Sequence, residues 1–156
     1  MEGIGAIAIS SMIKHSTSIR VRYADTDQMR SVYYGKYFEY FEQARSDLLR
    51  SLGLPYTEIE NQGIFLPVIE AHAQYKKSAR YDDLLIVETI VKELPVARVR
   101  IEYKVVVEGS TEPIVEGYTV HGFVNAATGR PTRAPAMFRQ TLEEAMKQSG
   151  GSHAEA

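Results

Sequence analysis

The stretch RYADTDQMRSVYYGKYFEYFEQAR, residues 22–45, joins two different hydrophobic patterns. On its N-terminal side, apolar residues alternate with arginines over residues 19–23, which predicts a half-buried β-strand. On its C-terminal side, apolar residues recur at spacings of three and four over residues 35–52, which predicts a helix with a broad apolar face. Two aspartates, Asp25 and Asp27, lie between the two patterns. A helix with so much apolar surface needs a sheet to pack against, so this stretch decides the fold.

The rest of the chain predicts four further strands and a closing helix. The strand candidates alternate or run continuously in apolar residues, and Pro67 indicates a bulge or an edge in the first of them. The predicted strands are residues 63–77, 83–94, 98–108 and 112–125, and the predicted helix is residues 135–148. Short turns between the late strands predict antiparallel pairing, and such sheets twist. The predicted fold is therefore α+β, with one antiparallel sheet curled round a long helix.

Composition bounds the class of protein. With 156 residues and 44% apolar content, the chain has the size and core of one domain, which we expect to span residues 17–148 between flexible termini, residues 1–16 and 149–156. A net charge of −2 gives no basic face for nucleic acid, and no apolar run reaches the length of a membrane span. The absence of cysteine excludes disulfides, thiolate nucleophiles and cysteine-bound zinc. This composition fits a cytoplasmic protein, which we expect.

The two aspartates permit two interpretations. Aspartate is a favoured turn and N-cap residue, so both carboxylates could serve only to cap the junction. Alternatively, one of them could face the N-terminus of the helix, where unpaired backbone N–H groups and the helix dipole favour negative charge. Tyr34 and Gly35 should lie at that N-terminus, and a glycine there lets a substrate carbonyl approach the backbone closely.

The same stretch resembles a known family. Its D-x-D, short loop, V-Y-Y and aromatic helix YFEYFEQAR are similar to hotdog-fold acyl-CoA thioesterases of the 4-hydroxybenzoyl-CoA thioesterase type, including the YbgC-type enzymes encoded beside the Tol-Pal system. Two later stretches, YKKSARYDDLLIVET (residues 75–89) and GRPTRAP (residues 129–135), resemble other shared segments of the family. The resemblance implies a hotdog fold, in which a five-stranded antiparallel sheet wraps round one central helix. It also implies homodimers or homotetramers with active sites between two subunits.

The resemblance assigns roles to residues at the junction. The second aspartate of D-x-D, Asp27, matches the family's catalytic carboxylate, which acts as a nucleophile or as a general base. Asp25 is then expected to have a structural role or to be exposed. The backbone N–H of Tyr34 or Gly35 would polarise the thioester carbonyl. Two positions depart from the pattern, because Arg30 replaces a usual glycine and Lys36 replaces a frequent asparagine. Glycine can serve a positive-φ turn, whereas Arg30 could offer a cation to an acidic substrate.

Coenzyme A carries phosphates, so basic side chains should flank the mouth of such a site. The candidates are Arg80 and Lys77 before a predicted strand, Arg133 in a later turn, and Arg30. The alternative for each is an ordinary solvated surface residue. The implied reaction needs no cofactor, since coenzyme A is part of the substrate, and the histidines lack the spacing of a metal site.

The predicted function is acyl-CoA thioester hydrolysis, which yields a free acid and coenzyme A. A non-catalytic acyl-CoA-binding module of the same fold is one alternative. A hotdog dehydratase acting on hydroxyacyl thioesters is another, although that branch usually carries a histidine where this chain has Tyr34. The acyl group (aliphatic or aromatic), the carrier (coenzyme A or acyl carrier protein) and the choice between dimer and tetramer stay open at this point.

Overall fold

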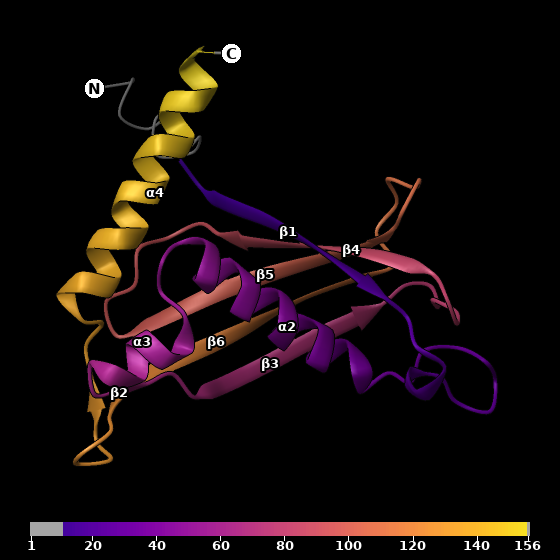
Figure 1. Cartoon of the computed structure of the whole chain (residues 1–156), viewed down its shortest axis with the longest axis horizontal. Helices are drawn as coiled ribbons and strands as arrows, with labels where there is room; N and C mark the ends of the chain where they lie inside the picture. The colour runs from indigo at the N-terminus through magenta and orange to yellow at the C-terminus, as the bar shows by residue number, and fades with distance from the viewer. Residues whose placement is uncertain (1–10, 156) are drawn as a thin grey trace.

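The computed structural model describes the backbone of residues 11–155 and the side chains of residues 11–149. One long helix, α2, lies across a face of an antiparallel sheet (Figure 1). The strands are β1 (Ile13–Arg20), β2 (Ile64–Phe65), β3 (Val68–Tyr75), β4 (Leu84–Val91), β5 (Arg98–Val107), β6 (Val115–Asn125) and β7 (Pro131–Thr132). The helices are η1 (Tyr23–Asp25), α2 (Lys36–Ser51), α3 (Tyr56–Asn61) and α4 (Ala136–Glu155). The long helix and the five long strands confirm the predicted fold, and the other short elements are additional.

The sheet is antiparallel at every pairing. Strands β1, β4, β5 and β6 follow one another across it, and β3 pairs with the other side of β6. The short strands β2 and β7 both pair with the end of β6 at Val124. Pro67 separates β2 from β3, and the register shifts between Val68 and Glu70, so the bulge predicted here is confirmed. Strands β1 and β3 are therefore the two edges of the long-stranded sheet.

Helix α2 is held to the sheet by its apolar face. The ring of Phe41 in α2 stacks on the ring of Tyr103 in β5, with 4.3 Å between the ring centroids. Gly117 of β6 permits this approach, because a Cβ atom there would lie 2.9 Å from the Phe41 ring. Leu48 and Leu49 are buried one turn before the helix ends, and each such side chain stabilises the fold by about 1.5–3 kcal/mol. This packing fixes where the N-terminus of α2 lies.

The first strand begins earlier than predicted. Strand β1 starts at Ile13, so its first four residues belong to the sheet and not to a flexible terminus. Ile13 is buried, and His15 and Thr17 contact the Asp47 carboxylate of α2 at 3.1 and 2.7 Å. These tertiary contacts stabilise a polar segment that lacks the apolar alternation of a strand. Tyr23, which was predicted in the same strand, lies in the single turn η1 instead.

The last helix is longer than predicted. Helix α4 continues to Glu155, past the predicted end at residue 148, so that boundary was placed too early. Phe138, Leu142 and Met146 are buried and anchor the helix up to its last turns. The hydroxyl of Ser149 also donates a hydrogen bond to the carbonyl of Met12 at 3.0 Å. Neither α4 nor any other helix within residues 11–155 is long and apolar enough to cross a membrane. Residues 1–10 and 156 lie outside the described part, so the predicted flexibility there stays a prediction.

Candidate active site

Asp27 opens a tight loop between β1 and α2. Thr26 and Val32 form an antiparallel bridge across the loop, and the Asp27 N–H donates to the Ser31 carbonyl at 2.9 Å. The Arg30 N–H closes the turn on the Asp27 carbonyl, also at 2.9 Å. Arg30 has a φ of 65°, a left-handed conformation that costs a residue with a Cβ about 1–2 kcal/mol. The loop therefore has the backbone shape that a glycine would favour, although an arginine occupies the position.

The Asp27 carboxylate is exposed and held at one oxygen. Its Oδ1 accepts hydrogen bonds from the backbone N–H of Met29 at 2.9 Å and of Ser31 at 3.4 Å. Its Oδ2 accepts no hydrogen bond from any described residue. The capping interpretation is thus correct for one oxygen, and it also fixes the orientation of the carboxylate. The second oxygen remains open to a substrate or a water molecule.

Asp25 differs from Asp27 because it is buried, with 3% of its surface exposed. It accepts hydrogen bonds from the Tyr40 hydroxyl at 2.9 Å and the Arg22 N–H at 3.0 Å, and Lys36 Nζ lies 3.9 Å away. Burial alone would raise the pKa of Asp25, but the hydrogen bonds from Arg22 and Tyr40 hold that pKa below its ordinary value. Asp25 therefore ties the end of β1 to the first turns of α2, and its predicted structural role is confirmed.

The N-terminus of α2 presents two free backbone N–H groups. Gly35 is the N-cap, with helical φ and ψ of −65° and −23°. Lys36 N–H donates to the Tyr33 carbonyl at 2.9 Å, and Tyr37 N–H donates to the Tyr34 carbonyl at 3.3 Å. The N–H groups of Tyr34 and Gly35 have no acceptor within the described part of the chain. Because the positive end of the helix dipole lies at the same point, these two groups can stabilise a negatively charged oxygen.

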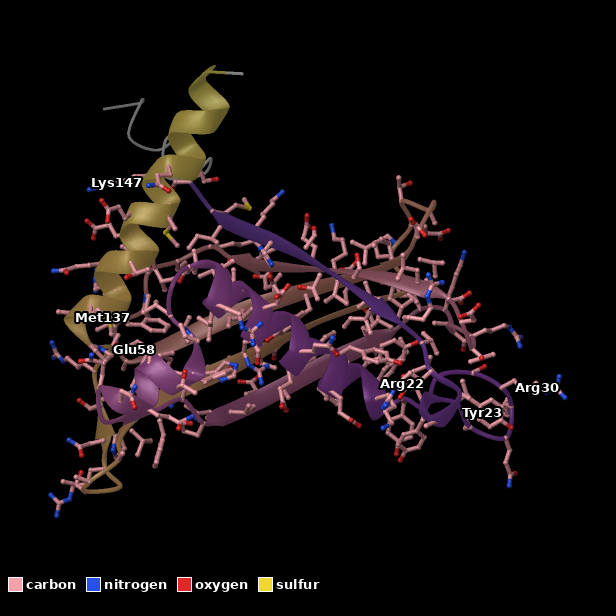
Figure 2. The ribbon with its side chains drawn as sticks, in the orientation of Figure 1. Arg22, Tyr23, Arg30, Glu58, Met137 and Lys147 are labelled. Atoms are coloured by element: carbon pink, nitrogen blue, oxygen red, sulfur yellow. The ribbon has the colours of Figure 1, made fainter. Side chains whose placement is uncertain are left out.

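The basic candidates do not all lie near this loop. Arg30 is at the tip and points away from the sheet and helix (Figure 2). Arg80 pairs with Ser31 in a β-bridge, which places it beside the loop, whereas Lys77 is engaged with Glu112 at 2.8 Å. Arg133 follows β7, which pairs with the far end of β6 (Figure 1).

The distance along β6 separates Arg133 from the rest of the site. Tyr75 pairs with Val115, whereas Thr132 pairs with Phe123. Val115 and Phe123 are eight residues apart along β6, which at about 3.4 Å per residue is about 27 Å. Within one chain, Asp27 and Arg30 lie on the loop that leads into α2, Arg80 is bridged to that loop, and Arg133 lies far from all three.

Exposed tyrosine side chains near the loop form two ring clusters and were not predicted. The clusters, together called the tyrosine patch, are Tyr23 with Tyr81, and Tyr33 and Tyr34 with Tyr75, and each side chain is at least 43% exposed. Their rings pair as neighbours, with centroids 5.8 Å apart for Tyr23 and Tyr81, 4.6 Å for Tyr33 and Tyr34, and 6.2 Å for Tyr34 and Tyr75. Clustered exposed apolar surface marks an interaction site. The tyrosines are visible in the sequence, but their clustering depends on contacts between residues 23 and 81 and between residues 34 and 75, which are far apart in the chain.

Other polar features lie away from the loop. A groove of about 740 Å³ between β1 and α2 is lined by Ser16, Thr17, Ser18, Glu39, Glu42, Gln43, Ser46, Asp47 and Arg50. It includes neither Asp27 nor Gly35 and has few apolar side chains, so it does not fit an acyl chain. His121 is buried and hydrogen-bonded, as predicted, whereas His72 is exposed and its ring stacks on that of Tyr118. No cluster of three or more potential metal ligands occurs among the described residues.

Comparison with known proteins gives the family. The model of the thioesterase-like superfamily matches residues 21–142, which contain the Asp27 loop, α2 and the four long strands β3, β4, β5 and β6. The chain belongs to this superfamily. Acyl-CoA thioesterase YbgC of Helicobacter pylori is 30% identical over 131 residues, covering 79% of this chain and 96% of the relative. The crystal structure of DHNA-CoA thioesterase from Staphylococcus aureus superposes with a TM-score of 0.77 at 32% identity, covering 91% of this chain and 94% of that one.

Some matches within the superfamily are partial. Acyl-CoA thioesterase YbgC of Haemophilus influenzae is 38% identical over 90 residues, 57% of this chain and 66% of the relative. Two other relatives at 37% and 39% identity are matched over 54% and 59% of their length. The chain thus spans between about half and two thirds of these relatives. These comparisons establish the superfamily and the fold.

Proposed function

We propose that this thioesterase-superfamily protein hydrolyses the thioester bond of an acyl-CoA to a carboxylic acid and coenzyme A. The observation that carries the proposal is the free Oδ2 of Asp27 on a loop that leads into the α2 N-terminus, where the N–H groups of Tyr34 and Gly35 are free. The thioesterase names of several relatives support hydrolysis over a binding module or a dehydratase.

In the proposed reaction, the thioester carbonyl oxygen accepts hydrogen bonds from the Tyr34 and Gly35 N–H groups. Asp27 then acts in one of two ways. As a nucleophile, its Oδ2 attacks the carbonyl carbon, the C–S bond breaks, and water hydrolyses the resulting mixed anhydride. As a general base, Oδ2 takes a proton from a water molecule that attacks the same carbon. In both routes the thiolate of coenzyme A leaves and is protonated, and the N–H groups stabilise the negative charge on oxygen.

The proposed binding of coenzyme A uses the basic side chains near the loop. In this proposal, Arg30 at the tip of the loop and Arg80, which is bridged to Ser31, supply guanidinium groups, and a guanidinium is well suited to a phosphate group. Lys77 joins them if its ion pair with Glu112 opens. No cofactor is proposed, because coenzyme A is part of the substrate. Since acyl-CoA esters are intracellular and the chain has no cysteine, we propose a cytoplasmic setting.

Self-association is part of the proposal. Strand β3 pairs with β6 on one side only, and Val68 and Ile69 at its start are each 50% exposed. Antiparallel pairing of two β3 edges in a homodimer would place the start of one β3 beside Tyr75 at the end of the other. The β7 end of the partner, with Arg133, would then approach the Asp27 loop, and Tyr75 with its neighbour Tyr34 would be covered. A homotetramer would be two such dimers.

A substrate panel tests the proposed function. The purified full-length chain is mixed with aliphatic and aromatic acyl-CoA esters, with the matching acyl carrier protein esters as a second set, and free thiol is measured. We expect thiol and free acid to appear in equal amounts from at least one class of acyl-CoA. Binding of acyl-CoA without thiol release would instead indicate the non-catalytic module. Formation of an enoyl product from a hydroxyacyl-CoA would indicate the dehydratase.

A further inference from the structure

The last residue of β3 contacts the backbone at the start of α2. The Tyr75 hydroxyl donates a hydrogen bond to the Tyr34 carbonyl at 3.1 Å, across 41 residues of sequence. The Tyr75 ring also packs against the rings of Tyr34 and Tyr37, with centroids 6.2 and 5.5 Å away. A tyrosine hydroxyl is protonated at neutral pH, and burial first, then the neighbouring Tyr34, raise the pKa of Tyr75 further. Tyr75 is thus a stable donor to this one carbonyl.

The carbonyl that Tyr75 holds belongs to the peptide group of Gly35. In a planar trans peptide, the C=O of Tyr34 and the N–H of Gly35 lie in one plane and point in opposite directions. Hydrogen bonds to the Tyr34 oxygen therefore set the direction of the Gly35 N–H. They also polarise the peptide, which strengthens that N–H as a donor.

The two free N–H groups are not held equally by the helix. The N–H of Tyr34 shares its peptide group with the Tyr33 oxygen. That oxygen accepts a hydrogen bond from the Lys36 N–H at 2.9 Å. The N–H of Gly35 shares its peptide group with the Tyr34 oxygen. That oxygen accepts a hydrogen bond from the Tyr37 N–H at 3.3 Å, which is long for such a bond. The Tyr75 hydroxyl is the second bond to this oxygen. The helix alone therefore fixes the Gly35 N–H less firmly than the Tyr34 N–H.

We propose that Tyr75 is a positioning residue for thioester hydrolysis, which aligns the Gly35 N–H by holding the Tyr34 carbonyl. This inference rests on the proposed function. Tyr75 does not touch the reacting atoms in this account and acts through the Tyr34–Gly35 peptide. Because the alignment matters most when the carbonyl oxygen gains negative charge, losing the hydroxyl affects kcat more than KM.

The test compares Tyr75→Phe with a matched control. Tyr75→Phe keeps the ring and removes the hydroxyl. Tyr118→Phe removes a hydroxyl that bonds Glu70 on the outer face of the sheet, away from the Asp27 loop. Both variants are studied as full-length protein, with melting temperature and oligomeric state measured beside the kinetics. For Tyr75→Phe we expect kcat about fivefold lower and KM within about twofold of wild type. For Tyr118→Phe we expect both constants unchanged.

An NMR readout tests the geometry independently of activity. The amide cross-peak of Gly35 reports hydrogen bonding at the preceding carbonyl, so Tyr75→Phe should shift it, while Gly129 in the remote β6–β7 turn should not move. A shifted Gly35 peak together with the selective loss of kcat supports the positioning role. An unmoved Gly35 peak overturns it, and so does an unchanged kcat in an active enzyme. The proposal is also overturned if Tyr75→Phe and Tyr118→Phe lose kcat to the same extent and in proportion to their lowered melting temperatures. A wild-type protein inactive on every substrate refutes the proposed function instead.

Discussion

Lowering the pH should destabilise the protein through His121, a histidine of β6 with no exposed surface. Its Nε2 lies 2.9 Å from the Thr119 hydroxyl and its Nδ1 lies 3.3 Å from the Leu66 carbonyl. The buried guanidinium of Arg45 is part of the same network, bonded to the Tyr103 hydroxyl at 3.0 Å. Burial first, and the positive charge of Arg45 second, lower the pKa of His121 from 6.5 to about 4.

The shift in pKa sets the magnitude and sign of the effect. Each pKa unit is worth about 1.4 kcal/mol, so a shift from 6.5 to about 4 corresponds to about 3 kcal/mol in the free energy of unfolding. Between these two pKa values, the unfolded chain binds a proton at this histidine and the folded chain does not. Stability from this group is therefore constant above about pH 7, falls as the pH drops from 6.5 to about 4, and levels off below that.

Urea denaturation at several pH values and a fixed protein concentration measures this effect. His121→Gln removes the titrating group, and His72→Gln removes an exposed histidine that stacks on Tyr118 as the matched control. Carboxylates titrate in all three proteins, so the comparison isolates the histidine. We expect the free energy of unfolding of His121→Gln to fall less steeply between pH 7 and 4 than that of wild type and of His72→Gln. Parallel pH profiles for all three proteins would refute the reasoning.

Two further predictions concern the loop before α2. Asp25→Asn removes the charged acceptor of the Tyr40 hydroxyl, so it should lower the free energy of unfolding by about 2 kcal/mol at pH 7. The difference in urea midpoint between the variant and wild type should narrow as the pH falls below 3.8, because the unfolded wild-type chain then binds a proton at Asp25 while the folded chain, whose Asp25 pKa is lower, does not. An equal gap at all pH values would contradict this. Arg30→Gly should raise the free energy of unfolding by about 0.5–1 kcal/mol, because glycine adopts the left-handed φ of this residue without strain. Asp82→Gly should have the same effect, since Asp82 has a φ of 70°. A loss of stability in both variants would show that neither backbone is strained.

The sequence predicted the fold because its strongest signals are local. The spacing of apolar residues in α2 and the alternation in β5 reflect burial on one face, and both elements are close to their predicted bounds. The start of β1 was missed because the segment KHSTS (residues 14–18) has no apolar alternation and is stabilised by contacts with Asp47, a residue some 30 positions away. The length of α4 was missed because glycines at residues 150 and 151 disfavour a helix that the anchored turns before them sustain.

The site was predictable only in part. The spacing of D-x-D does not distinguish two carboxylates, whereas the structure buries Asp25 and leaves one oxygen of Asp27 open. The resemblance indicated the α2 N-terminus, but the donor role of Tyr75 arises from a contact between β3 and α2 that no local pattern encodes. For the same reason, sequence position could not reveal that Arg133 lies at the other end of β6.

The most direct measurement of the central claim is the hydrolysis rate of Asp27→Asn on the best acyl-CoA of the panel. Asparagine keeps an oxygen for the N–H groups of Met29 and Ser31, so the loop should keep its shape, and an unchanged melting temperature checks this. Asp82→Asn is the matched control, because it changes an exposed aspartate whose left-handed backbone asparagine tolerates. The account predicts that kcat/KM falls at least about 100-fold in Asp27→Asn and stays unchanged in Asp82→Asn. A loss in Asp27→Asn of less than about tenfold, only ~1.4 kcal/mol of barrier, would contradict it.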